Sequence, residues 1–402
     1  PEVQDYICDV IRYWVSEFDV DGIRLDAADV LDFDFMRALR HTAEEVKPDF
    51  WLMGEVIHGD YSRWVNGETL HSVTNYALHK ALYSGHNDHN YFEIAHTVKY
   101  LQNMGNLDLY NFVDNHDVER IYTKLSNKAH FTPVHILLYT LPGIPSIYYG
   151  SEFGIEGRKE RSSDDSLRPA LNITDYKDAV TSNPCTALIT ALGKIRQHTP
   201  ALSYGSYTEL QLTNRQYAFA RDLDNMRVII TVNNDDNDAW MNLPAGNAAE
   251  YVGTLTGQKV AVEGGCINVC VGANSGEIWV PTEDTSVPET FSENKDSIVE
   301  ETPVTQEEVK NEGSAETKTA PASSIPEAAS TKEDTDRTPA SAEKEPVNFD
   351  SNKAPEDMSI EELQAGILAK MATNGSVTDQ MKKTVYDNIW HDSLVNWIKS
   401  FR

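Results

Sequence analysis

The sequence predicts an α/β protein whose main domain is the C-terminal part of a (β/α)8 barrel of the TIM type. Two observations support this prediction. Up to about residue 199, amphipathic helical segments alternate with short apolar strands, which is the rhythm of a parallel sheet with helical crossovers. Several of these strands run directly into acidic residues, and the strand ends of a parallel barrel form its active face. Five strands are expected, so a closed barrel of eight would lack its first three.

The elements of this region can be assigned in chain order. A helix over 3–18 precedes the first strand at 21–25, and a helix over 33–46 ends before Pro48, because proline cannot continue it. The other expected strands lie at 50–53, 71–75, 109–113 and 146–149, and the other helices lie between 76 and 104, at 133–139 and at 184–198.

The pattern changes after the barrel region. Short alternating segments separated by Asn, Asp and Gly turns predict a small antiparallel β domain. The following segment is rich in Pro, Ser, Thr and acidic residues, so we expect a disordered acidic linker that buries too little apolar surface to offset chain entropy. Apolar residues at helical spacing then predict a helical tail that docks on the same chain or on a partner. The four expected domains are 1–200, 201–282, 283–355 and 356–402.

Charge and composition exclude several classes of partner. The formal net charge of −29 would repel nucleic acid and anionic membranes, whereas a neutral sugar suits it. No stretch approaches the roughly 20 apolar residues of a spanning helix, so we expect no membrane segment. The sequence does not determine the compartment, for which we favour the cytoplasm. It does not determine the oligomeric state either, and it is compatible with a homo-oligomer.

Metal-binding patterns are weak. The four cysteines are too few and too scattered for a disulfide framework or a zinc site. His86, Asp88 and His89 stand close together in a predicted loop, but no fourth ligand is in view, and a solvated loop is the simpler interpretation. We therefore expect no metal site.

Three acidic residues lie within four positions after predicted strands: Asp26, Glu55 and Asp117. Because strand ends share one face of a barrel, we expect these side chains to lie close together. Cleaving a glycosidic bond with retention needs one carboxylate to attack the anomeric carbon and a second, initially protonated, to protonate the leaving oxygen. A third negative charge would stabilise the positively charged transition state.

Four runs surround these acids in order: DGIRLDAAD (21–29), MGEV (53–56), FVDNHD (112–117) and GIPSIYYGSE (143–152). Together they resemble the successive signature blocks of the α-amylase superfamily, over roughly residues 1–281. The resemblance implies a retaining glycoside hydrolase. Its substrates would be maltodextrins, cyclodextrins or pullulan, cleaved at α-1,4 glucosidic bonds, with cleavage at α-1,6 bonds as an open alternative.

The resemblance also implies roles for single residues. Asp26 matches the nucleophile, Glu55 the general acid/base and Asp117 the carboxylate that stabilises the transition state. Arg24 matches the arginine that keeps the nucleophile ionised and oriented. His116 matches the histidine that donates to hydroxyls of the sugar being cleaved.

Further details are similar to the neopullulanase and cyclomaltodextrinase group. Two segments carry this similarity, GEVIHGDYSRW (54–64) and the NY pair at 75–76. They add four substrate-facing candidates: His58, Trp64, Asn75 and Tyr76. Packing at the barrel rim is an equal alternative for Trp64 and Tyr76. Val30 stands where many members have a histidine whose backbone helps to hold a structural calcium. The resemblance therefore predicts neither calcium nor another cofactor.

Two alternative functions stay open. The same acid pair would serve an α-glucan transglycosylase, in which a sugar replaces water as the acceptor. The other alternative is an inactive chain that retains only glucan binding. The family's third-strand block, which supplies an aspartate and a histidine to the same subsite, does not occur in this sequence. We therefore expect the chain by itself not to be a competent enzyme.

Overall fold

The computed structural model describes residues 2–282, 358–374 and 398. The chain forms two compact units, Pro1–Thr302 and Pro303–Arg402. The expected linker at 283–355 and most of the tail after residue 374 lie outside the described residues.

Five short parallel strands follow one another in chain order. They are β1 (Gly22–Leu25), β2 (Trp51–Gly54), β3 (Ser72–Val73), β4 (Tyr110–Phe112) and β5 (Ile144–Ser146). Strands β1, β2 and β3 form one ladder and β4 pairs with β5. A parallel bridge between Thr74 and Tyr110 joins the two groups. Parallel strands arranged in chain order are what a (β/α) barrel requires.

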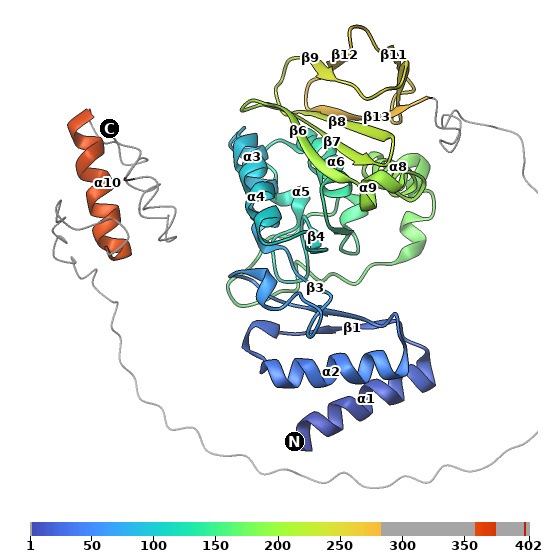
Figure 1. Cartoon of the computed structure of the whole chain (residues 1–402), viewed down its shortest axis with the longest axis vertical. Helices are drawn as coiled ribbons and strands as arrows, with labels where there is room; N and C mark the ends of the chain where they lie inside the picture. Colours follow the sequence, from blue (N-terminus) through green and yellow to red (C-terminus); the bar gives the residue numbers. More distant parts are fainter. Residues whose placement is uncertain (1, 283–357, 375–397, 399–402) are drawn as a thin grey trace, which may run out of the picture. The chain divides into compact units, whose positions relative to one another are not determined.

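Helices connect and cover these strands. They are α1 (Glu2–Phe18), α2 (Phe33–Val46), α3 (Tyr76–Asn87), α4 (Tyr91–Asn103), α5 (Ile121–Lys124), α6 (Phe131–Thr140), α7 (Ala179–Ser182), α8 (Pro184–His198) and α9 (Pro200–Tyr204). Short 3-10 turns lie at Ala28–Val30, Tyr61–Arg63, Lys128–His130, Ser151–Phe153 and Ile173–Tyr176. Helix α2 lies against β1, with α1 beside it (Figure 1). It begins where the Asp32 side chain accepts a hydrogen bond from the Phe35 N–H, which is an ordinary N-cap.

The fifth strand lies two residues earlier than predicted. Its ladder begins with the Ile144 N–H donating to the Leu109 carbonyl at 2.8 Å, and Tyr110 pairs with Ile144. The apolar pattern of 146–149 instead belongs to a segment that leaves the sheet, because Tyr148 and Tyr149 pack on the Arg120 guanidinium.

Residues 206–281 form an antiparallel β structure. Its strands are β6 (Ser206–Leu212), β7 (Gln216–Leu223), β8 (Met226–Asn233), β9 (Ala239–Pro244), β10 (Glu250–Gly253), β11 (Lys259–Ala261), β12 (Cys266–Val271) and β13 (Ser275–Pro281). Six of them form a sheet in the order β11-β10-β13-β8-β7-β6. The β9–β12 ribbon covers one face of this sheet, and α6, α8 and α9 lie on the other side (Figure 1).

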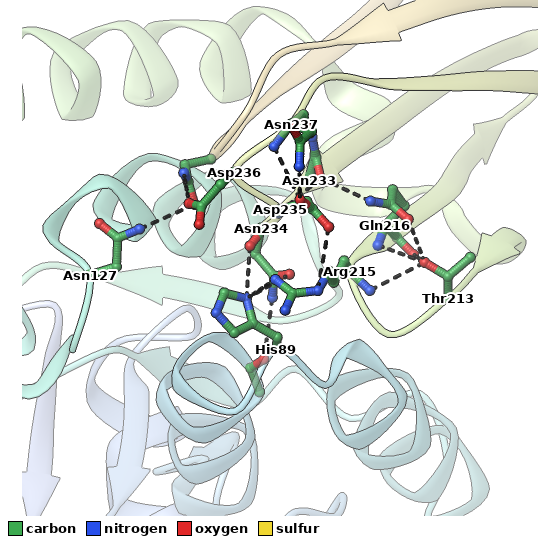
Figure 2. Close-up of polar contacts among 12 residues, drawn as sticks. His89, Asn127, Thr213, Arg215, Gln216, Asn233, Asn234, Asp235, Asp236 and Asn237 are labelled. Carbon is green, nitrogen blue, oxygen red and sulfur yellow. Dashed lines mark hydrogen bonds and ion pairs between the residues drawn. The ribbon is translucent and has the colours of Figure 1, made fainter.

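A polar cluster ties the turn between α3 and α4 to two turns of the β structure (Figure 2). His89 Nδ1 lies 2.8 Å from the Asn234 carbonyl and 2.8 Å from Arg215 Nη1. Arg215 Nε in turn lies 3.4 Å from Asp235 Oδ2. The Tyr91 N–H donates to the Asn214 carbonyl at 2.9 Å, so backbone as well as side chains join the two regions.

The histidines considered above as loop residues do not lie in one solvated loop. His86 is part of α3 and fully buried, and burial lowers its pKa to about 3. Its Nδ1 lies 2.6 Å from the Leu82 carbonyl and its Nε2 lies 3.3 Å from the Tyr91 hydroxyl. Asp88 is the C-cap of the helix. Among the described residues, no three His, Cys, Asp or Glu side chains are grouped to hold a metal ion.

The described part of the second unit is mainly α10 (Ile360–Asn374), in the place where the sequence predicts the first tail helix. It begins with a reciprocal capping box. The Glu362 N–H donates to Ser359 Oγ at 3.2 Å, and the Ser359 N–H donates to Glu362 Oε2 at 2.7 Å. No helix in the described ranges of either unit has the length and apolar character to cross a bilayer.

Candidate active site

The ends of β1 and β2 bring two carboxylates onto one guanidinium. Arg24 lies in β1, Asp26 follows that strand, and Glu55 follows β2. Arg24 Nη1 donates to Asp26 Oδ1 at 2.7 Å, and Nη2 lies 3.1 Å from Glu55 Oε2. A permanent cation shared in this way allows two acidic side chains to be close neighbours.

The backbone after β1 completes this arrangement. Ala27 has a left-handed conformation (φ 44°, ψ 46°), which costs a residue with a Cβ about 1 kcal/mol. In this conformation the Ala27 N–H donates to Glu55 Oε2 at 3.1 Å. The Ala28 N–H also donates to the Glu55 carbonyl at 2.8 Å. The strained turn thus holds Glu55, whose side chain is 14% exposed, whereas that of Asp26 is 81% exposed.

Asp117 lies in the loop after β4, and both of its carboxylate oxygens have partners. His116 Nε2 lies 3.0 Å from Oδ2, and Arg168 Nη2 lies 2.9 Å from Oδ1. Arg168 Nε also donates to the His116 carbonyl at 3.0 Å. The Asn115 side chain accepts the Asp117 N–H at 2.8 Å and so fixes the turn. The carboxylate is therefore oriented by two basic side chains.

The buried carboxyl group of Asp114 anchors the loop that carries Asp117. Asp114 Oδ2 accepts hydrogen bonds from the Ile121 N–H and from Ser151 Oγ, both at 2.7 Å. Burial is the main reason why the pKa of Asp114 rises to about 6. The fully buried Arg120 donates to the Leu167 carbonyl at 2.7 Å and stacks on the Tyr148 ring at 4.1 Å. The loop that carries Asp117 is thus anchored at both ends.

Tyr76 connects the two parts of the site. Its hydroxyl accepts a hydrogen bond from Asn115 Nδ2 at 3.1 Å. Burial raises the pKa of Tyr76, the charges of Glu55 and Asp117 raise it further, and the Asn115 bond and the charge of Arg24 oppose the rise. Glu55, Asp117 and Arg24, from the ends of β2, β4 and β1, therefore all lie near this one phenol.

Two of the four less central candidates, Asn75 and Trp64, are buried. Asn75 is buried at 1% exposure: its Oδ1 caps α3 by accepting the Leu78 N–H, and its Nδ2 donates to Asn111 Oδ1 at 2.8 Å. Trp64 is 4% exposed and stacks on Phe33. The structure thus gives Asn75 and Trp64 packing roles rather than positions facing a substrate. His58 lies exposed in the loop after β2.

Two residues join the site that the sequence patterns do not identify. Arg168 and Asp164 lie in the long segment after β5, and Arg168 Nη2 also pairs with Asp164 Oδ2 at 3.0 Å. Lys159 lies 2.6 Å from Asp164, and this contact is the main reason why the pKa of Asp164 is lowered. Neither residue follows a strand, and Arg168 meets Asp117 across 51 positions of sequence. Only the tertiary fold reveals this contact.

A cavity of about 490 Å³ lies beside Arg168. Its walls are mostly apolar or aromatic, and Phe153 stacks on Tyr176 at 3.9 Å. Tyr149 and Glu152 add polar groups to the lining. A concave site with apolar walls and a few polar groups is the usual form of a small-molecule site.

The comparison with family models agrees with this geometry. A model of the α-amylase catalytic domain matches residues 1–354. The chain belongs to the α-amylase family. The resemblance of the signature blocks is thereby confirmed, and the family implies a TIM-barrel-like fold for the five parallel strands.

Curated relatives of this chain include a cyclomaltodextrinase and a maltogenic α-amylase. A cyclomaltodextrinase of Thermoanaerobacter pseudethanolicus is 31% identical over 241 residues, which cover 58% of this chain and 41% of that protein. A maltogenic α-amylase of Bacillus acidopullulyticus is 27% identical over 270 residues, covering 64% and 45%. The crystal structure of an Anoxybacillus α-amylase has a similar fold, with a TM-score of 0.63 at 24% identity, over 70% of this chain and 63% of that one. The chain spans less than half the length of the two curated relatives.

Proposed function

We propose that this α-amylase family chain carries the carboxylates of a retaining α-glucan hydrolase. The substrates would be maltodextrins, cyclodextrins or pullulan, cleaved at α-1,4 bonds, with α-1,6 bonds as a second linkage to test. The observation that supports this most directly is the Arg24 guanidinium shared by Asp26 and Glu55. Arg24 joins the exposed carboxylate of Asp26, which a substrate can reach, to the carboxylate of Glu55, which also accepts the Ala27 N–H.

The mechanism is a double displacement. Asp26 attacks the anomeric carbon while Glu55 gives its proton to the leaving oxygen, so the glycosidic bond breaks and a glycosyl ester forms on Asp26. Glu55, now ionised, takes a proton from water, which attacks the same carbon and releases Asp26. Asp117, oriented by His116 and Arg168, stabilises the positive charge that develops on the sugar.

Of the substrate-facing candidates, those whose side chains are not buried can contact a sugar. Tyr76 and His58 are the candidates that would meet the sugar, together with the aromatic walls of the cavity beside Arg168. The proposal uses no metal or cofactor.

The test compares the parent protein with Asp26→Asn and Glu55→Gln, in a polypeptide that includes the family's third-strand block. With maltotriose as substrate, each variant should lose at least about a thousandfold in kcat, because each removes one of the two obligatory groups. Unchanged release of reducing sugar from either variant would refute the assignment. Products longer than maltotriose would show that transfer to sugar competes with hydrolysis.

A further inference from the structure

The β9–β12 ribbon presents an unusual outer face. Strand alternation places Met241, Leu243, Ile267 and Val269 in the core of the β structure. The alternate residues of the same strands therefore point outward. These outward residues are Trp240, Asn242, Pro244, Cys266, Asn268 and Cys270. None of them is charged, although the chain as a whole carries a net charge of −29.

Trp240 is the prominent member of this face, because its side chain is 69% exposed. The register sets Trp240 opposite Cys270 and Asn242 opposite Asn268. Asn242 is two residues from Trp240 on the same face of its strand, and Asn268 is the diagonal neighbour across the ladder, about 7–8 Å away and within reach of a large aromatic side chain. We call Trp240, Asn242 and Asn268 the ribbon platform.

The chemistry of the ribbon platform suits a neutral sugar. A pyranose ring has an apolar face of C–H groups that can lie on an indole, and a rim of hydroxyls that donate and accept hydrogen bonds. Each asparagine amide offers two donors and an acceptor for such hydroxyls. With no charge among the outward residues, nothing in the platform selects an ionic ligand.

The size of the face argues against a stable protein partner. Six-residue strands are about 20 Å long, and two of them side by side are about 10 Å wide, giving roughly 200 Å². A stable dimer needs on the order of 800 Å² from each partner. A short length of oligosaccharide fits this area, whereas a second copy of the chain would need contacts beyond it.

We propose that the ribbon platform is a surface binding site for α-glucan, separate from the carboxylate site. The choice of α-glucan rests on the proposed function, while the existence of a sugar site rests on the platform itself. The ribbon covers the face of the six-stranded sheet opposite to α6, α8 and α9 (Figure 1). A polysaccharide held there would stay bound to the protein while another part of it meets the active site.

Native gel electrophoresis of the chain in soluble amylopectin tests this site, with Glu55→Gln as the background to prevent turnover. Trp240→Ala should weaken retardation by about fivefold in apparent Kd, the value of one lost aromatic contact, and Trp240→Phe should restore part of it. Tyr204→Ala is the matched control, because Tyr204 is an 81% exposed aromatic residue outside the ribbon. The double variant Asn242→Ala/Asn268→Ala tests the same platform without touching the indole.

Equal retardation of the Trp240→Ala and Tyr204→Ala proteins would overturn the proposal. Retardation of the parent by hydroxyethyl cellulose to the same extent would overturn the choice of α-glucan. A dimer that is lost in Trp240→Ala, measured by light scattering, would assign the face to self-association. Activity is measured separately, in the polypeptide with the third-strand block and with Glu55 intact. Retardation through Trp240 without activity in that polypeptide would refute the hydrolase and leave the platform standing. Activity there without Trp240-dependent retardation would refute the platform and leave the hydrolase standing.

Discussion

At the scale of single residues, Arg24 joins the two carboxylates that the proposed mechanism uses as nucleophile and acid. Its two terminal nitrogens contact the side chains of both Asp26 and Glu55, and the fixed fork of a guanidinium sets the distance between the two contacts. The proposed mechanism needs these two carboxylates on one sugar, so their relative position decides the rate more than the binding of substrate.

Arg24→Lys should therefore lower kcat by about a hundredfold or more, with KM for maltotriose changed by less than about threefold. A lysine has one ammonium on a flexible stem and cannot hold both carboxylates in the same geometry. Steady-state kinetics in the active polypeptide measure the effect. Arg12→Lys is the control, because Arg12 also contacts two carboxylates, those of Asp9 and Glu45, but on an exposed helix face. Similar kinetics for the two variants would contradict the role of Arg24.

Residues placed by local structure were predictable from the sequence. Asp26 and Glu55 follow their strands directly, so the strand pattern places them on one face, whereas Asp117 lies five residues after β4 and its role came from the FVDNHD resemblance. Arg168 was not predictable, because it reaches Asp117 from a long segment without a strand. Asn75 shows a different limit: a strand end gives its position along the chain but not that its side chain caps the next helix.

At the scale of elements, the helices were easier to predict than the strands. The ranges predicted for α2 and α8, 33–46 and 184–198, agree with the structure, where Asp32 and Asn183 cap their first turns. The barrel strands β1 to β5 are only two to four residues long, and their ends depend on which backbone groups find a partner in the neighbouring strand. In β5, pairing of Ile144 with Tyr110 decided the position against the apolar pattern.

Helix α6 is almost entirely buried, and one of its buried residues can titrate. His135 Nδ1 bonds the Phe131 carbonyl at 2.8 Å, and the other ring nitrogen, Nε2, is buried with no hydrogen-bond partner among the described residues. Burial lowers the pKa of His135 to about 4. The unfolded chain binds this proton near pH 6.5, so the stability that neutral His135 contributes is present above pH 6.5 and is lost as the pH falls towards 4.

His135→Leu should thus unfold at a lower pH than the parent. At pH 7 the free energy of unfolding should change little, and at pH 4.5 the variant should be more stable by about 2.5 kcal/mol, from the difference between the two pKa values. Urea titrations at both pH values measure this. His198→Leu makes the same change at an exposed position of α8 and is the matched control. A parallel pH profile for parent and His135→Leu would refute the account.

At the scale of the whole first unit, the barrel helices and the β structure share one core. The largest apolar cluster contains Leu137 of α6 and Leu192 of α8 together with Phe219, Ile230 and Ile278 of the six-stranded sheet. Such packing makes the two regions depend on each other for stability. The sequence indicated both regions through their different periodicities, but it could not show that they bury a common surface.

Arg221 is the polar counterpart of this shared core. It lies in β7 at 1% exposure, and burial lowers its pKa to about 10. Its guanidinium donates to the Thr140 carbonyl at the end of α6 at 2.6 Å and to the Gly205 carbonyl at 2.8 Å. Both carbonyls lie where a helix ends, so they have no further residue of that helix to bond them.

Arg221→Met should destabilise the first unit by about 2 kcal/mol, because two buried carbonyls lose a charged donor while the apolar stem is largely kept. The decisive comparison is Arg227→Met on the neighbouring strand. Arg227 pairs with Asp222 in a partly exposed position, and its loss should cost less than about 1 kcal/mol. Urea unfolding is measured for both variants by pulsed hydrogen exchange, which separates peptides of the barrel region, such as those of α6, from peptides of β7 and β13. If Arg221 joins the two regions, both sets of peptides should become unprotected together at lower urea. A shift confined to the peptides of the β structure, or equal losses in the two variants, would mean that the β structure unfolds independently of α6.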